Sequence, residues 1–382
     1  MSEVFIVDAC RTPRGKRGGS LSQTHPIDLA VTPLQAIVER NGLDPARIED
    51  VIYGCVSQRD EQDNVIAREA VLAAGLPDTV PGFTINRFCA SGLTACNMAA
   101  HTIMAGQADL IIGGGVEHMT RVPMNVEFRM AGSLLDERYP DLVPQGISAE
   151  MIAERYGFSR QDLDGFAAES QRRAAEAWEK ERFARSIVPT PATDEAGQAF
   201  NLEHDEHMRP GTTADKLAKL KPVFKEDGVI HAGNSSGIVD GAAAVLFASK
   251  RACQEYGLKP RARIVATQTV GSEPKIMLLG PIPCTEKILA KAQWKIGDVD
   301  LFEVNEAFAP VPLAWSRDTG AELAKTNVNG GAIALGHPLG ATGAMLLGTL
   351  LDELEARDQK RGLVTLCVGL GMASATLIER VT

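Results

Sequence analysis

The outer thirds of the chain repeat one order of features. In the first third, an apolar run at 50–56 (DVIYGCV) precedes Cys89, which stands at the start of a small-residue helix, and a second apolar run follows at 108–115. The last third has a histidine between two such runs: DLFEVNEA at 300–307, His337 and GLVTLCVGLG at 362–371. Two copies of one strand, loop, helix and strand unit explain this order. The duplication predicts that the cysteine and the histidine face each other across a pseudo-twofold axis.

The remaining patterns favour an α/β fold. Strand-like apolar runs are separated by helical or glycine-rich segments, which is typical of α/β layers. These runs lie at 4–8, 51–56, 108–112, 262–266, 300–304 and 363–368. Residues 184–235 show little periodicity, so we interpret 117–240 as a loop-rich insertion of the kind that carries binding residues. Inside it, Ser159 and Asp162 resemble a capping box that opens a long helix.

Composition excludes several classes of protein. A formal net charge of -10 argues against a nucleic-acid binder, because phosphate neutralisation needs a basic face. Seven cysteines without C-x-x-C spacing indicate neither a disulfide framework nor a zinc site, and favour a reducing compartment. No run reaches the roughly 18 apolar residues that span a bilayer, and the start does not resemble a signal peptide. We therefore predict a cytoplasmic protein without membrane insertion.

Cys89, His337 and Cys367 are candidate catalytic groups, and each has a structural alternative. A thiol at a helix start can have a lowered pKa, but free cysteines are among the most buried residues. A histidine opposite the thiol can take its proton, and Cys367, at a strand end, can act as an acid or a base. Asn305 and Glu306 interrupt an apolar strand end. They either cap a helix or hold a water molecule, and both interpretations stay open.

Two weaker patterns are poor evidence for a metal site or a phosphate-binding site. The EHDEH run at 203–207 offers metal-ligating side chains, but it lies in a charged loop without HExxH spacing. The glycines at 113–115 lack the spacing of a phosphate-binding loop. We predict no metal site.

Taken together, the motifs closely resemble the thiolase family, over essentially the whole chain. They are RTPRGKRGG at 11–19, NRFCASG at 86–92, HAGNSSGIVDGAAAV at 231–245, NEAFA at 305–309, NVNGGAIALGHPLGATG at 327–343 and C-x-G-x-G at 367–371. The resemblance implies a duplicated, five-layered α-β-α-β-α core with an inserted loop domain. The implied division is an N-terminal half at 1–116 and 241–261, a CoA-binding insertion at 117–240 and a C-terminal half at 262–382.

The resemblance also implies an acetyl-CoA C-acyltransferase or C-acetyltransferase. Such enzymes cleave a 3-ketoacyl-CoA with CoA, or run the reverse Claisen condensation, as in fatty acid metabolism and β-oxidation. Cys89 resembles the acylated nucleophile, His337 its base and Cys367 the second acid or base. Asn305 would hold a water that shares an oxyanion hole with His337 Nε2, and the N–H groups of Cys89 and Gly369 would form the other oxyanion hole.

Coenzyme A is implied as a substrate, with no permanently bound cofactor. Residues resembling the CoA contacts are Arg209 at the adenine, Ser236 at the pantetheine, and the apolar Phe224, Leu220, Met277 and Phe308 along its tunnel. Further basic candidates are Lys216, Lys219 and Lys221. The implied assembly is a homodimer or a dimer of dimers, with a β-oxidation partner subunit as a further option.

The chain also departs from the family pattern. Leu370 and Ala373 replace glycines near the end, and PQGISAE, with Pro144 and Gln145, stands where short-chain biosynthetic members carry His-Met-Gly. The segment 121–143 looks shorter than in tetrameric biosynthetic members. Acetoacetyl-CoA specificity and tetramerisation are therefore left open.

Two alternatives to a thiolase enzyme were weighed. A non-catalytic acyl-CoA or lipid-binding member would have lost chemical residues, and none is lost. A decarboxylating ketoacyl synthase would pair its cysteine with two histidines, whereas here Asn305 takes the place of the second histidine.

Overall fold

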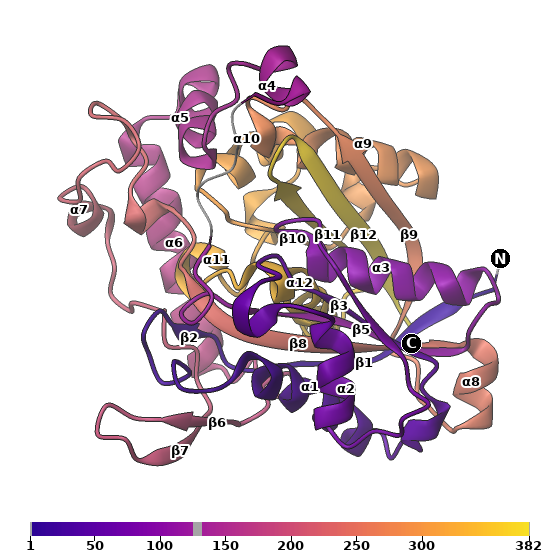
Figure 1. Cartoon of the computed structure of the whole chain (residues 1–382). Coiled ribbons are helices and arrows are strands. Elements are labelled where there is room, and N and C mark those ends of the chain that lie inside the picture. Colours follow the sequence, from indigo (N-terminus) through magenta and orange to yellow (C-terminus); the bar gives the residue numbers. More distant parts are fainter. Residues whose placement is uncertain (1, 125–131, 382) are drawn as a thin grey trace.

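One continuous sheet organises the molecule (Figure 1). The computed structural model describes residues 2–124 and 132–381, so part of the segment 121–143 lies outside the described residues. Within the described part the strand order is β10-β11-β12-β9-β1-β8-β5-β3-β4, with β2 beside β8. The strands are β1 (Val4–Arg11), β2 (Gly15–Lys16), β3 (Asp50–Gly54), β4 (Gly82–Ile85), β5 (Leu110–His118), β8 (Val239–Ser249), β9 (Ala262–Gly271), β10 (Leu301–Val304), β11 (Arg361–Val368) and β12 (Met372–Arg380).

The sheet confirms the predicted duplication. Outward from the centre, β1, β8, β5 and β3 on one side correspond to β9, β12, β11 and β10 on the other. Each half contains two antiparallel pairings followed by a parallel one, and the N-terminal half adds a second parallel pairing, of β3 with β4. The halves join where β1 pairs with β9, through Phe5 with Arg263 and Ile6 with Ala262. The pseudo-twofold axis therefore passes between these two strands.

Helices complete five layers. In the middle layer, α3 (Ser91–Met104) and α12 (Leu339–Ala356) share one apolar core with both halves of the sheet. The outer face of the N-terminal half is covered by α1 (Pro26–Arg40) and α2 (Ile66–Ala73). The outer face of the C-terminal half is covered by α9 (Pro281–Ala292) and α10 (Pro310–Thr319). The predicted α-β-α-β-α arrangement is confirmed.

Glycines let the two central helices touch at their N-termini. A Cβ atom at Gly92 would stand 2.6 Å from the carbonyl oxygen of Gly340. A Cβ atom at Gly343 would stand 2.2 Å from the backbone nitrogen of Leu93. Larger residues at these positions would force the helices apart. The starts of α3 and α12, and the residues just before them, are thus held side by side.

The segment between β5 and β8 forms the insertion, which lies along the left of Figure 1. The capping box of Ser159 and Asp162 is present at the start of α6, as predicted. Elements of this segment are α4 (Leu134–Arg138), α5 (Gln145–Tyr156), α6 (Arg160–Glu179), the hairpin of β6 (Thr190–Thr193) and β7 (Ala199–Leu202), and α7 (Ala214–Leu217). Short helices elsewhere are α8 (Lys250–Glu255) and α11 (Ala332–Leu335).

The EHDEH run joins the insertion to the first strand. The Asp205 carboxylate accepts two hydrogen bonds from the Arg11 guanidinium, at 2.7 and 2.9 Å, and one from the backbone N–H of Arg14. Glu206 accepts from the hydroxyl of Ser20 at 2.7 Å. Both carboxylates are therefore used as structural acceptors.

No helix in the described part of the chain is long and apolar enough to cross a membrane.

Candidate active site

A tight loop places Cys89 just before the start of α3. Phe88 adopts a positive φ of 43°, and its N–H donates to the side chain of Asn86 at 2.8 Å. The Ser91 hydroxyl donates to the carbonyl of Phe88 at 2.6 Å and accepts from the N–H of Arg87 at 2.8 Å. These bonds fix a left-handed residue that is uncommon outside glycine. The loop holds the thiol two residues before the helix.

Burial dominates the acidity of Cys89. The residue is 4% exposed, and removal from water raises the pKa of its thiol to about 11, with the nearby Glu117 carboxylate acting in the same direction. Hydrogen bonds from the backbone N–H of Cys89 and from the Gln145 side chain lower this pKa but do not offset burial. A helix start can lower the pKa of a thiol, but at Cys89 desolvation of the thiolate is the larger effect.

His337 stands two residues before α12, the position that corresponds to Cys89. Its Nδ1 lies 2.6 Å from the Thr342 hydroxyl, which donates its own hydrogen to the carbonyl of Pro338 at 3.0 Å. The hydroxyl oxygen must therefore accept from Nδ1–H, which leaves Nε2 as a hydrogen-bond acceptor. Burial and the Arg14 charge lower the pKa of His337 to about 3. The ring is neutral, with Nε2 as its basic atom.

Asn305 brings a second polar group to His337 Nε2. Its side-chain Nδ2 lies 3.3 Å from that nitrogen, and its backbone N–H donates to the carbonyl of Thr365 at 3.0 Å. The Asn305 Oδ1 atom is buried and has no hydrogen-bond partner among the described residues. Buried polar oxygens are nearly always paired in proteins, so this atom is an acceptor that a ligand or water can satisfy.

Cys367 and Gly369 reach the same region from the end of β11. Burial raises the pKa of Cys367, and the negative charge of a Cys89 thiolate would raise it further. A Cβ atom at Gly369 would stand 3.6 Å from the ring of Phe88 and 3.2 Å from Gln145 Nε2. The C-terminal strand end therefore lies beside the loop that carries Cys89.

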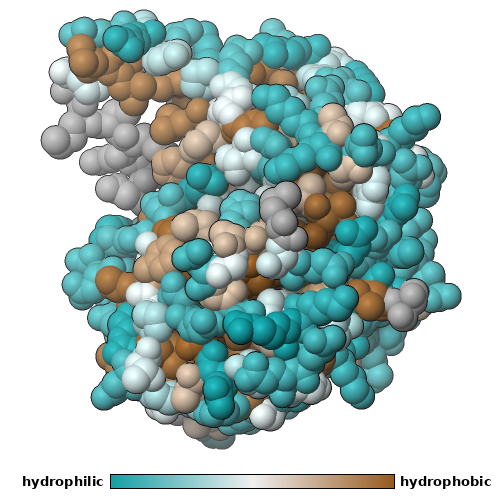
Figure 2. All heavy atoms as spheres, turned by 90° about the vertical axis from the view of Figure 1, so that its right-hand side faces the viewer, coloured by the Kyte–Doolittle hydropathy of each residue, from teal (hydrophilic) through white to brown (hydrophobic). Residues whose placement is uncertain are grey.

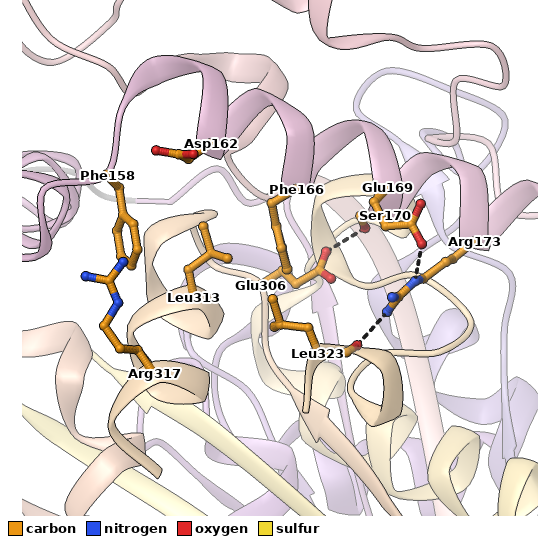
Figure 3. A pocket seen from close by; sticks show the side chains of 10 residues that line it. All are labelled: Phe158, Asp162, Phe166, Glu169, Ser170, Arg173, Glu306, Leu313, Arg317 and Leu323. Atoms are coloured by element: carbon orange, nitrogen blue, oxygen red, sulfur yellow. Dashed lines mark hydrogen bonds and ion pairs between the residues drawn. The ribbon is translucent and has the colours of Figure 1, made fainter. Parts of the chain in front are cut away.

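Glu306 points away from this site, which resolves the alternative left open for it. Its carboxylate accepts from the Ser170 hydroxyl at 2.7 Å, from Asn327 Nδ2 at 2.9 Å and from the N–H of Ile333 at 3.2 Å. Figure 3 shows Glu306 among the residues that line a cavity of about 450 Å³ between α6 and α10, and none of the candidate catalytic residues lines this cavity. Glu306 therefore has a structural role.

The predicted CoA contacts line the same end of the molecule. Met277, Phe308 and Cys367 share one apolar cluster, and Phe224 meets Phe308 edge-on with 5.9 Å between ring centroids. The N–H of Ser236 donates to the carbonyl of Ala307 at 2.9 Å.

The two outer CoA candidates lie farther along the insertion. A Cβ atom at Gly233 would stand 2.8 Å from Leu220 Cδ1, so this exposed leucine borders the loop of Ser236. The exposed Arg209 is held through its backbone N–H, which donates to Gln171 Oε1 at 2.8 Å.

Sequence reasoning missed three residues of the site: Glu117, Gln145 and Thr342. The buried Glu117 accepts backbone N–H groups of Val56, Ser57 and Gly340 at 2.8 to 2.9 Å, and so ties β3 to the start of α12. A lone carboxylate in the apolar run GGGVEH was the available signal for Glu117. Thr342 lies in the glycine-rich motif around His337, and Gln145 is part of the departure in PQGISAE.

Known protein families and known proteins match this chain along nearly its whole length. Residues 4–251 match the family "Thiolase, N-terminal domain" and residues 258–380 match "Thiolase, C-terminal domain". A β-ketoadipyl-CoA thiolase of Pseudomonas aeruginosa is 45% identical over 401 residues, covering 99% of each chain.

Two solved structures are similar to this chain over its full length. The acetyl-CoA acetyltransferase of Bacillus anthracis has a TM-score of 0.92 at 39% identity, covering 100% of this chain and 99% of that chain. Human mitochondrial 3-ketoacyl-CoA thiolase has a TM-score of 0.92 at 38% identity, with the same coverage. With both domain families matched in order, and relatives alike from end to end, this chain belongs to the thiolase family.

Proposed function

We propose that this protein is a thiolase that cleaves a 3-ketoacyl-CoA with CoA, or runs the reverse condensation, through an acyl-enzyme on Cys89. The observation that carries the proposal is the contact between the starts of α3 and α12, which follow Cys89 and His337 directly. Asn305 Nδ2 lies 3.3 Å from His337 Nε2, and Cys89 is near enough to Cys367 to raise its pKa. The non-catalytic alternative is not supported, because every chemical group of the family pattern is present.

In the first half of the reaction, Cys89 attacks the ketone carbonyl of the substrate. His337 Nε2 accepts the thiol proton, which the Thr342 contact permits by keeping the other ring nitrogen protonated. The C–C bond then breaks, the acyl group stays on sulfur, and acetyl-CoA leaves after Cys367 protonates its enolate. Covalent catalysis divides one difficult displacement into two easier steps.

Two sets of donors would stabilise the developing negative charges. The free Asn305 Oδ1 can accept a hydrogen bond from a water, and this water and a protonated His337 would donate to the enolate oxygen. The N–H groups of Cys89 and Gly369 would serve the tetrahedral intermediate at Cys89. Preorganised donors in a water-excluded site are worth several kcal/mol of transition-state stabilisation.

CoA would enter from the insertion side. Ser236, Phe224, Leu220, Met277 and Phe308 would line its path toward Cys367, and Arg209 with the lysines at 216, 219 and 221 would meet the phosphates and adenine. A local basic patch is needed because the chain as a whole is acidic.

A substrate panel tests the function. Relatives and similar structures are named for β-ketoadipyl-CoA, acetyl-CoA and 3-ketoacyl-CoA chemistry. We expect thiolysis of at least one member of a panel from acetoacetyl-CoA to long 3-ketoacyl-CoAs that includes 3-oxoadipyl-CoA, and loss of all thiolysis in Cys89→Ser. Wild-type rates in Cys89→Ser would exclude the proposed mechanism. Cys96→Ser, on the buried face of α3, is the matched control.

We also propose a cellular compartment and a metabolic role for the protein. All seven cysteines are free and buried, which supports a reducing compartment such as the cytoplasm. A role in β-oxidation and association with a partner subunit are expectations from the family. Thiolysis of plain 3-ketoacyl chains in preference to 3-oxoadipyl-CoA would support the β-oxidation role.

A further inference from the structure

Another cavity, of about 220 Å³, lies where the C-terminal half of α6 meets the segment 324–329 and the residue that follows α12. None of the candidate catalytic residues or candidate CoA contacts lines it. One lining side chain is a carboxylate, that of Glu176, and five are cationic: Arg172, Arg173, Lys180, Arg182 and Arg357. Because the whole chain has a formal net charge of -10, this cavity is a local exception that attracts anions.

Carboxylates neutralise the positive charge of the cavity only in part. Glu176 is the one acid in the lining, and two further acids pair with lining cations from outside it. The ion pairs are those of Arg172 with Glu169 and Glu176, Arg173 with Glu169, Lys180 with Glu176, and Arg357 with Glu353. Five cations therefore share three carboxylates, which leaves an excess of two positive charges among these groups.

Arg182 is the lining cation without a partner. Its side chain makes no hydrogen bond, ion pair or ring contact with any residue of 2–124 or 132–381, although the residue is half-buried. Its backbone is fixed, because its N–H donates to the carbonyl of Ala177 at 2.9 Å and the next residue, Phe183, is only 1% exposed. A guanidinium carries five N–H donors and is always charged. Arg182 thus offers unused donors to a ligand in the cavity.

The volume of the cavity limits the size of that ligand. At roughly 30 Å³ for each water molecule of the liquid, the cavity holds about seven water molecules. This space suits a phosphate or diphosphate group but is too small for a nucleotide with its sugar and base. Four of the five cations are arginines, whose planar forks match the oxygen atoms of phosphate groups.

We propose that this cavity is a binding site for a small phosphate-type anion, of about the size of diphosphate, held by Arg182 and the four cations around it. The proposed CoA contacts lie outside its lining, so the site does not depend on the proposed thiolase function.

Isothermal titration calorimetry with inorganic diphosphate tests the site. We expect saturable binding to the wild-type protein, which weakens as added salt screens the charges. Arg182→Gln should lower the affinity at least about tenfold, because it removes hydrogen bonds to a charged group. Arg17→Gln makes the same change of charge at an exposed arginine outside the lining, and should keep the wild-type affinity. Absence of saturable binding to the wild-type protein would overturn the proposal.

The proposed CoA contacts are the competing place for diphosphate, because CoA itself contains a diphosphate group. We expect Arg209→Gln to keep diphosphate binding, and Arg182→Gln to keep the wild-type KM for CoA. Loss of diphosphate binding in Arg209→Gln but not in Arg182→Gln would assign the anion to the CoA contacts instead. ADP should bind the Arg209→Gln protein no more tightly than diphosphate, and clearly tighter binding of ADP would contradict a ligand of diphosphate size.

A second variant serves if Arg182→Gln does not fold. The Lys180 side chain is 55% exposed, so Lys180→Gln should fold. It should weaken diphosphate binding several-fold, because one positive charge is removed and Glu176 loses one of its two partners. Unchanged affinity for diphosphate in either folded variant overturns the proposal.

Discussion

The hydrogen-bond chain from Pro338 through Thr342 to His337 decides which ring nitrogen can take a proton. All three groups are buried or held by buried backbone, so water does not compete for these bonds. The chain was not predicted from sequence, because it depends on a side-chain geometry that a glycine-rich motif does not reveal. It assigns Thr342 as a positioning residue for the base.

Thr342→Val tests this role. Valine has the same shape but cannot accept from Nδ1–H, so the ring loses its preference for the productive tautomer. We expect kcat to fall about 10- to 100-fold, on the scale of lost partners of functional histidines, with KM for CoA unchanged and the pH dependence of kcat altered. Thr349→Val, a buried threonine seven residues along α12, should keep the wild-type pH profile. An unaltered profile in Thr342→Val would contradict the role.

Local sequence patterns predicted some residues well and others poorly. The burial of α3 and the capping box of α6 follow from patterns within a few turns, and both are confirmed. The direction of the pKa shift at Cys89 had no local signal, because the burial that raises it comes from segments distant in the chain. The hydrogen bond from the N–H of Gly340 to Glu117 joins residues 223 positions apart, so no local pattern contains it.

At the scale of elements, strands with apolar residues between polar segments were predicted, and two central strands were missed. The missed strands are β8, which reads VDGAAAVLFAS, and β12, which reads MASATLIER. Both are buried on both faces, and their first halves are rich in alanine, glycine and serine, so they show neither alternation nor a strong apolar run there. Their place next to β1 and β9 is set by the duplication of the sheet.

Strand β10 carries a buried acid with a pH-dependent effect on stability. Burial and the neighbouring Glu306 and Glu353 carboxylates raise the pKa of Glu303, which Arg14 and Arg173 only partly offset. Its Oε2 atom has no hydrogen-bond partner within the described ranges. Because folding raises this pKa, the contribution of Glu303 to stability is present at low pH and is lost as the pH rises toward the raised value.

Glu303→Gln should therefore flatten the pH dependence of stability. The neutral amide removes a penalty of about 1.4 kcal/mol for each pKa unit, so the Tm of the variant should exceed that of the wild type at alkaline pH and approach it at acid pH. Thermal unfolding across a pH series measures the difference. Glu39→Gln, on the exposed side of α1, should follow the wild type. Parallel curves for Glu303→Gln and wild type would refute the expectation.

At the scale of the whole molecule, the edge of the sheet indicates self-association. Strand β4 is the last strand at one end, and its Phe83 and Ile85 side chains are apolar but only partly buried. Figure 2 shows apolar side chains gathered at mid-height on the right-hand face of Figure 1, between hydrophilic areas. Exposed strand edges with apolar side chains are sites of pairing with another chain.

We predict that the protein is a homodimer or a dimer of dimers. Light scattering during size-exclusion chromatography should give twice or four times the chain mass of 40.8 kDa. A concentration-independent mass of one chain would contradict the prediction. Pairing of edges would also cover the loop that follows β4 and carries Cys89.

The central claim is that the duplicated halves meet to make Cys89 the acylated nucleophile. Intact-mass analysis and peptide mapping after incubation with acetyl-CoA test it directly. We predict one acetyl group on the peptide that contains Cys89, its loss on adding CoA, its absence in Cys89→Ser and its presence in Cys96→Ser. An acetyl group on any other residue, or none on wild-type protein that cleaves a 3-ketoacyl-CoA, would contradict the account.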